Sequence, residues 1–233
     1  MTRAVRPLTE APDFHPIASL LGAPIVDIEH VMPGDLCLVG LFEDHSDSLH
    51  FGARFAARQI RYASLGESSI CQPAGQARVL DLGDLNVFPL ERERNLAALI
   101  RQVTAIAERG AVPIIVGGAF DMGNVMQGVA ERSTGCEVAR IRLPNLASDT
   151  TTLDQQSAVV LTVDVALCTP FSFAEKRPLA RLRQAIEGLN AQCIKAVHLT
   201  GLAPELDLCG RHESALGDHV LRLIVAHLRR TGA

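Results

Sequence analysis

The sequence predicts a three-layer α/β/α domain built on a mostly parallel sheet. Short apolar segments rich in β-branched residues alternate along the chain with longer segments of helical periodicity. Parallel strands need crossover helices, and sheets of this kind are covered by helices on both faces. The chain has 233 residues, of which 48% are hydrophobic and 21% charged, so it can bury one continuous core. We therefore expect a single domain over residues 1–233.

Six segments are expected to be strands, because each is short, apolar and rich in β-branched residues. They are Leu36–Phe42, Ala77–Leu82, Val112–Val116, Val138–Leu143, Ala158–Val163 and Ile194–Leu199. In a mostly parallel sheet, functional sites gather at the carboxyl ends of the strands. Residues that follow these segments are therefore the first candidates for a site.

Two helices are predicted from apolar residues spaced three and four positions apart. The first lies between Arg92 and Gly110, and Gly110 is the residue type that ends a helix in the left-handed conformation. The second covers the last segment of the chain, where the same spacing recurs from Leu216 to Leu228. Residues 1–24 contain four prolines and are expected to be an irregular N-terminal segment that wraps the surface or contacts another subunit.

Composition argues against several kinds of partner and location. With 22 Lys and Arg against 26 Asp and Glu, one Tyr and no Trp, the chain lacks the basic field and stacking side chains that nucleic acids bind. No apolar run approaches the roughly 20 residues that span a bilayer. The first 16 residues carry two arginines without a following apolar region, so we expect no secretory signal and a cytoplasmic protein.

The cysteines and the common catalytic signatures give no site. Six cysteines are scattered too widely for a zinc knuckle or a CxxC pair, and we expect reduced, mostly buried thiols. The nucleophile elbow, the phosphate-binding loop, HExxH and the dinucleotide fingerprint are all missing. The loop Glu43–His50 holds five possible oxygen or imidazole ligands for a divalent ion, although a solvated loop is the simpler interpretation.

Four separated blocks carry a family resemblance. They are Val39–Phe42 with Phe51–Arg61, Val79–Val87, Pro113–Gly118, and the pair Thr162–Pro170 and Ala196–Asp207. In this order they are similar to "PGARFGPRAIR" and its preceding strand, "DLGDVNV", the residues before "GGDHS", and "SIDIDVLDP" with "GFDVVEVNPAYD". From Leu36 onward the chain thus resembles the arginase and agmatinase (ureohydrolase) family. The resemblance implies a ureohydrolase-like fold of the arginase/deacetylase type, shortened between Arg132 and Ser157.

The resemblance also implies the place of a site, because enzymes of this family hold two manganese ions at the strand ends. The residues at the matching ligand and substrate positions are Phe120, Asp164, Ala166, Thr169, His198 and Gly201. Only Asp164 keeps a ligand, Phe120 replaces a histidine, and no DAHxD motif remains. Converging carboxylates repel one another without metal, so we expect such ligands to be lost together. We predict no metal, cofactor or catalytic residue, and a vestigial pocket of Phe120, Asp121, Asp164, His198 and Asp207.

These expectations describe a pseudoenzyme that acts as a non-catalytic subunit or as an assembly or regulatory partner. It would form a homo-oligomer, or a hetero-oligomer with an active relative. One alternative is a sensor that binds a guanidino compound or polyamine near Asp164 and Asp207. Another is a divergent amidinohydrolase whose chemistry has moved to residues 43–50. In the closed pocket, Phe120 is expected to be a core residue and Asp164 an unpaired acid.

Overall fold

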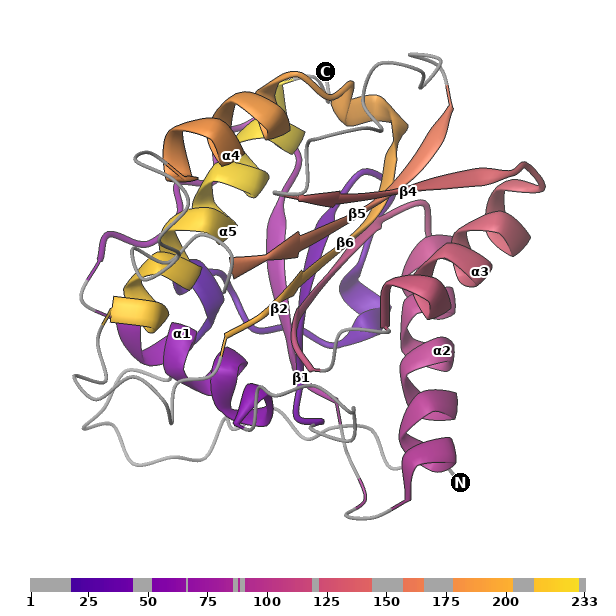
Figure 1. The fold of residues 1–233 in the computed structure, drawn as a ribbon, viewed down its shortest axis with the longest axis horizontal. Coiled ribbons are helices and arrows are strands. Elements are labelled where there is room, and N and C mark those ends of the chain that lie inside the picture. Colours follow the sequence, from indigo (N-terminus) through magenta and orange to yellow (C-terminus); the bar gives the residue numbers. More distant parts are fainter. Residues whose placement is uncertain are drawn as a thin grey trace.

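A six-stranded parallel sheet forms the middle layer of the protein (Figure 1). The computed structural model describes residues 18–43, 52–65, 67–85, 88, 91–118, 122–143, 157–165, 178–202 and 212–230. The strands are β1 (Leu36–Leu41), β2 (Val79–Asp84), β3 (Val112–Gly117), β4 (Val138–Leu143), β5 (Ala158–Asp164) and β6 (Ile194–Thr200). They lie in the order β2-β1-β3-β6-β5-β4, and all neighbours are parallel. The predicted fold class is confirmed, and every predicted strand is present.

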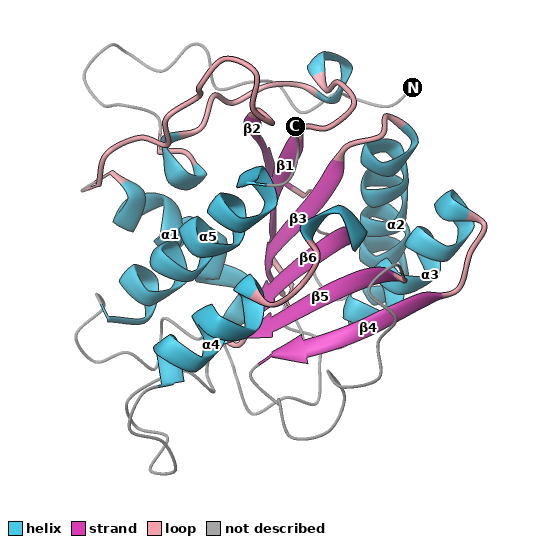
Figure 2. Ribbon diagram, turned by 90° about the horizontal axis from the view of Figure 1, so that it is seen from above, coloured by secondary structure: helices cyan, strands magenta, loops and turns pink. Residues whose placement is uncertain are grey.

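Five α-helices and four short 3-10 turns accompany the strands in the described part of the chain. The helices are α1 (Ala56–Ser64), α2 (Arg92–Glu108), α3 (Met122–Thr134), α4 (Pro178–Glu187) and α5 (His212–Arg230). The turns are η1 (Leu20–Gly22), η2 (Ile28–His30), η3 (Ala53–Phe55) and η5 (Ala191–Cys193). Helices α2 and α3 cover one face of the sheet, and α1, α4 and α5 cover the other (Figure 2).

Alternate residues of each strand supply two separate cores, because successive side chains point to opposite faces of a sheet. On β5, Val160 packs toward α2 and α3, whereas Leu161 packs toward α1, α4 and α5. Strand β1 divides in the same way, with Val39 on the α2/α3 face and Leu38 on the other. This division shows which face each polar residue near a strand end must occupy.

The N-terminal residues that the structure describes are part of the core. In η1, Leu20 and Leu21 are fully buried and pack into the cluster that contains α1 and α5. Burial of this kind stabilises a fold by about 1.5–3 kcal/mol for each side chain. Residues 1–17, which include most of the segment predicted to be irregular, lie outside the described residues.

The expectation of mostly buried cysteines is wrong for the residues that can be assessed. Cys37 on β1 is buried, but Cys71 and Cys136 lie exposed in loops, and Cys193 is half-buried. Burial and the nearby Asp35 raise the pKa of Cys37 to about 12, so this thiol stays protonated. Across the described ranges, no helix has both the length and the apolar character needed to cross a membrane.

Candidate functional site

A row of polar side chains crosses the carboxyl ends of three neighbouring strands. Arg142 on β4 lies in register with Thr162 on β5, and Thr162 lies in register with His198 on β6. Thr162 and His198 are fully buried. All three residues are on the face covered by α2 and α3, because Val160, two residues before Thr162, packs into that core. The row therefore lies beneath α3, where the family resemblance places its site.

Asp164 ends β5 one step beyond this row, on the same face. Its carboxylate is 4% exposed, and the Arg142 NH2 group lies 3.3 Å from Oδ2. The expectation that Asp164 is an unpaired acid is therefore wrong. A guanidinium from the neighbouring strand compensates its charge, and only the register of β4 against β5 brings the two side chains together.

His198 and Thr200 bind the main chain at the end of β3. The His198 Nε2 atom lies 3.0 Å from the carbonyl oxygen of Gly117, and the Thr200 hydroxyl donates to the carbonyl oxygen of Gly118 at 2.9 Å. Both glycines have positive φ values, 88° and 75°, which side-chain-bearing residues rarely adopt. The two polar side chains thus hold a tight turn between β3 and the segment that leads to α3.

The first turn of α3 packs directly onto the polar row. A Cβ atom at Gly123 would lie 2.7 Å from the Thr162 hydroxyl oxygen and 3.1 Å from Arg140 Nε, so glycine is required there. Among the described residues, the Thr162 hydroxyl has no hydrogen-bond partner. Among the described residues, the polar row on β4 and β5 is therefore packed against α3.

The predicted pocket residues divide into two groups. Asp164 and His198 lie on adjacent strands and on the same face, two residues apart in register. Phe120, Asp121 and Asp207 lie outside the described residues, so the pocket as a whole stays a prediction. The cavity between β1, α2 and α3 is lined by neither Asp164 nor His198.

The described residues do not fit the binuclear manganese centre that the resemblance implies. Manganese prefers several carboxylate, carbonyl or imidazole ligands around one point. Asp164 already carries a guanidinium, His198 Nε2 lies on a main-chain carbonyl, and Thr162 and Arg142 are poor ligands. Among the residues whose positions are described, no three His, Cys, Asp or Glu side chains come together around a common point.

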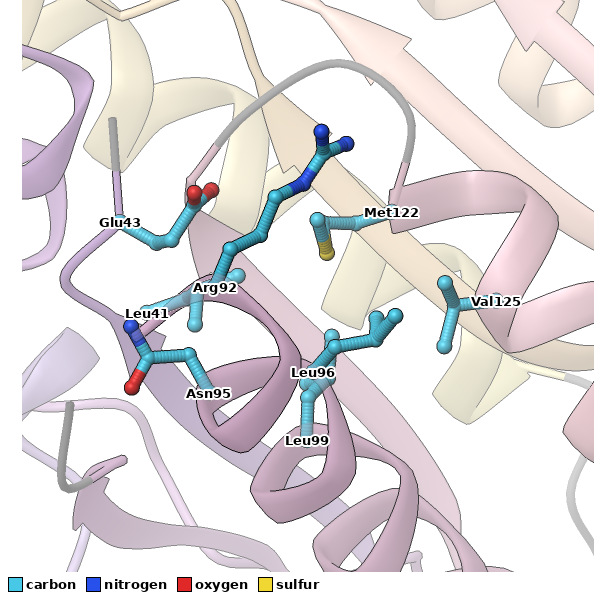
Figure 3. Close-up of a pocket in the computed structure, with 8 residues that line it drawn as sticks. All are labelled: Leu41, Glu43, Arg92, Asn95, Leu96, Leu99, Met122 and Val125. Atoms are coloured by element: carbon cyan, nitrogen blue, oxygen red, sulfur yellow. The ribbon is translucent and has the colours of Figure 1, made fainter. Parts of the chain in front are cut away.

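A small cavity also lies at the carboxyl ends of the strands, between β1 and the first turns of α2 and α3 (Figure 3). It encloses about 50 Å³ and is lined mainly by apolar side chains, with Glu43, Arg92 and Asn95 at its polar side. Since one water needs roughly 10–15 Å³ of such volume, the cavity has room for a few waters but not for agmatine. Glu43 is 4% exposed, and the rest of the predicted 43–50 ligand loop lies outside the described residues.

Sequence analysis missed an ion-pair network that joins two of the family-like blocks. Arg61 of α1 donates from Nε and NH2 to Oδ2 and Oδ1 of Asp81 on β2, at 3.1 and 3.0 Å, and from NH1 to Asp84. Asp81 also accepts hydrogen bonds from the main-chain N–H groups of Leu20 and Gly83, both at 2.8 Å. Although burial alone would lower it, the carboxylates raise the pKa of Arg61 above its ordinary value. A carboxylate within a buried strand was the available signal, because such a charge needs a partner.

Comparisons with known proteins agree with this geometry. A sequence model of the Arginase family matches residues 34–135. A hypothetical agmatinase from Burkholderia thailandensis superposes with a TM-score of 0.74 at 14% identity, covering 93% of this chain and 92% of that chain. Proclavaminate amidino hydrolase from Streptomyces clavuligerus gives 0.72 at 14% identity, covering 95% and 100%. Formimidoylglutamase from Bacillus subtilis gives 0.68 at 14% identity, covering 97% and 96%.

The chain has the fold that is seen in ureohydrolases. The resemblance to the arginase and agmatinase family is confirmed, in sequence over residues 34–135 and in fold over nearly the whole chain. At 14% identity, the structural matches show a shared fold but do not indicate an activity. The chemistry of the site therefore depends on this chain's own residues.

Proposed function

We propose that this protein is a ureohydrolase-fold scaffold without a metal centre, acting in the cytoplasm as a non-catalytic subunit or assembly partner. The observation that supports the proposal is the ion pair between Arg142 and Asp164. In the family that the chain resembles, the acid at this position is a metal ligand. Here the neighbouring strand supplies a fixed guanidinium to the same carboxylate.

Charge balance explains why this pair and a metal centre are alternatives. A carboxylate that is 4% exposed needs a positive partner, since an isolated buried charge is costly. One guanidinium balances one carboxylate. A divalent ion at Asp164 would lie beside the positive charge of Arg142, and the described residues supply none of the further acids that neutralise it in a metal cage. The pair therefore favours a metal-free site.

The rest of the fold retains the features that a scaffold needs. The network of Arg61, Asp81 and Asp84 holds α1 against the edge of the sheet. Cores on both faces contain fully buried aliphatic side chains. Exposed cysteines at Cys71 and Cys136 without a disulfide suit a reducing compartment. These features support the proposal of a stable protein that acts through contacts made by its surface.

Hydrolase assays test this proposal against its enzymatic alternative. Urea or ammonia release is measured with arginine, agmatine, guanidinobutyrate and formiminoglutamate after incubation with Mn²⁺. We expect no turnover above a heat-inactivated control. Turnover that disappears in His45→Ala or His50→Ala, but survives Asp164→Ala, would instead establish chemistry on the 43–50 loop.

A guanidino or polyamine sensor is the second candidate, and one observation gives it support. Asp164 already binds a guanidinium, that of Arg142, so its surroundings accept this group. A free ligand would have to displace Arg142 first. Thermal melts with arginine, agmatine and putrescine separate the two proposals, because a ligand that binds the native state raises the melting temperature. We expect no shift in the unmodified protein, whereas a clear shift that Asp164→Asn removes would favour the sensor.

A further inference from the structure

Strand β4 is the last strand in the order of the described sheet. It pairs with β5 along its whole length, from Val138 with Ala158 to Leu143 with Val163. No other strand of the described chain lies beside it (Figure 2). An edge strand directs alternate N–H and C=O groups away from its neighbour, and these groups can pair with another strand. Besides the β5 ladder, we find one hydrogen bond to the described main chain of β4, from Gln127 Nε2 to Val138 O at 2.7 Å.

The opposite edge of the sheet differs in this respect. Strand β2 is bordered by residues 24–26, which form a parallel bridge between Ile25 and Asp81. The N–H group of Val26 donates to Asp81 O at 3.0 Å, and the N–H group of Asp81 donates to Pro24 O at 2.9 Å. The chain thus covers part of one edge with its own residues. Within the described ranges, β4 is therefore the edge that no other segment covers.

The two faces of β4 have different chemistry. Ala139, Ile141 and Leu143 face the apolar core on the α4/α5 side. Arg140 and Arg142 face the α3 side, two residues apart. A strand added beside β4 would therefore meet aliphatic side chains on one face and guanidinium groups on the other. Cross-strand pairs of matching chemistry stabilise such an addition.

Among the described residues, the arginine face carries more positive than negative charge. Arg142 pairs with Asp164, whereas Arg140 donates to the neutral amide oxygen of Asn124. No carboxylate of the described residues forms an ion pair with Arg140. Burial and the charge of Arg142 lower the pKa of Arg140, as expected for a half-buried guanidinium beside a second one. An added acidic side chain would balance this charge.

We propose that the β4 edge binds an extended segment of a different protein that alternates acidic and aliphatic side chains. The acidic side chains would pair with Arg140 and its neighbour, and the aliphatic ones would extend the core beside Ile141 and Leu143. A second copy of this chain fits less well. Pairing two β4 strands would bring four guanidinium groups to one edge against two copies of Asp164. This inference rests on the proposed assembly role and names the chemistry of the partner.

Synthetic peptides test the proposal on the full-length protein. The probe is a fluorescent nine-residue peptide that alternates Glu and Val, and binding is followed by anisotropy. The comparison peptides alternate Lys and Val, carry a central proline, or place the same Glu and Val residues in two blocks. We expect the alternating Glu peptide to bind best. The proline peptide should bind at least about tenfold more weakly, because proline removes a ladder hydrogen bond and is poorly tolerated within sheets.

Charge reversal on the protein provides the residue-specific test. Arg140→Glu should lower the affinity for the Glu–Val peptide and raise the affinity for the Lys–Val peptide, each by about fivefold or more. The reason is that the cross-strand charge pairs change sign. Arg140→Gln, a milder change, should lower the affinity for the Glu–Val peptide by a smaller factor. The matched control is Arg101→Glu on the exposed side of α2, which should leave both affinities unchanged.

Several results would overturn the proposal. They are equal binding of the blocked and alternating peptides, unchanged affinities in Arg140→Glu, and slow hydrogen exchange along the outer side of β4 in the free protein. A concentration-dependent dimer that Arg140→Glu disrupts would assign the edge to a second copy instead. None of these measurements depends on metal content or hydrolase activity, so failure here is distinguishable from failure of the proposed metal-free scaffold.

Discussion

Arg61 and Asp81 form a two-point ion pair between α1 and β2, with Nε to Oδ2 at 3.1 Å and NH2 to Oδ1 at 3.0 Å. The Asp81 side chain is fully buried, and that of Arg61 is 9% exposed. Both residues belong to blocks that resemble the ureohydrolase family. Their role in this chain is structural, because every described hydrogen bond of the Asp81 carboxylate comes from Arg61 or from a main-chain N–H group.

Removing one member of this pair should be strongly destabilising. Arg61→Ala leaves Asp81 as a buried charge without its cation, a change that typically costs about 3–5 kcal/mol of unfolding free energy. Urea unfolding measures the loss. The control, Arg58→Ala, lies on the same helix but on an exposed position, and should cost under about 1 kcal/mol. Equal losses in the two variants would contradict the structural role of the pair.

A second prediction concerns Gly40, whose lack of a side chain leaves space for the ion-pair network of Arg61, Asp81 and Asp84. A Cβ atom at Gly40 on β1 would overlap Asp84 Oδ1 and lie 2.9 Å from the Ala57 Cβ atom. Gly40→Ala should therefore lower the unfolding free energy by about 1–3 kcal/mol through overpacking. Gly128→Ala is the comparison, because its Cβ meets only Arg132 NH1 at 3.6 Å on α3. That change should raise stability by about 0.5–1 kcal/mol, as for glycine within a helix.

Periodicity was enough to predict the six strands and helices α2 and α5, because their buried positions are apolar. It did not predict α1, whose core-facing side includes Arg61 and Ser64 among its buried residues. These polar residues interrupt the apolar spacing, and nothing along the chain shows that their partners are Asp81 and Asp218. Helix α4 was missed because it has only ten residues.

The candidate site could be predicted only in part, for a related reason. Matching blocks pointed to Asp164 and His198, and both lie at the carboxyl ends of adjacent strands. The partner of Asp164 was not predictable, since Arg142 lies 22 residues earlier and reaches it through the parallel register of β4 and β5. Patterns along one strand do not specify which residue of the next strand lies beside it.

The ion pair at the site should show energetic coupling. Asp164→Ala removes the ion pair with Arg142 and should lower the unfolding free energy by about 1–3 kcal/mol. Arg142→Ala and the double variant complete a mutant cycle. Because the Arg142 side chain is 39% exposed, we expect a coupling energy near the lower part of the usual range, about 1 kcal/mol. Additive effects of the two single variants would mean that the pair contributes nothing.

Stability should depend on pH through His227 near the end of α5. Burial lowers the pKa of His227, with a further contribution from the charge of Arg230, while its hydrogen bond to Leu189 O and the charge of Glu187 oppose the shift. Since the folded protein then holds the proton less tightly than the unfolded chain, stability is full above the unfolded pKa of about 6.5 and falls as the pH drops toward the folded pKa.

Unfolding free energies at several pH values between 7.5 and 5 measure this effect. His227→Gln should reduce the loss on acidification, because glutamine can donate to the carbonyl oxygen but does not titrate. The control is His219→Gln, an exposed position on the same helix, which should keep the pH dependence of the unmodified protein. An unchanged loss in His227→Gln would show that other groups cause it.

Metal content tests the central claim most directly. The protein is purified from cells grown in medium supplemented with manganese, nickel, zinc and iron, and its metals are counted by elemental mass spectrometry. Because Asp164 is held by Arg142 and the described residues supply no further ligand cluster, we predict well under one metal ion per chain. About two ions per chain, lost together in Asp164→Ala, would contradict the metal-free scaffold and indicate a hydrolase.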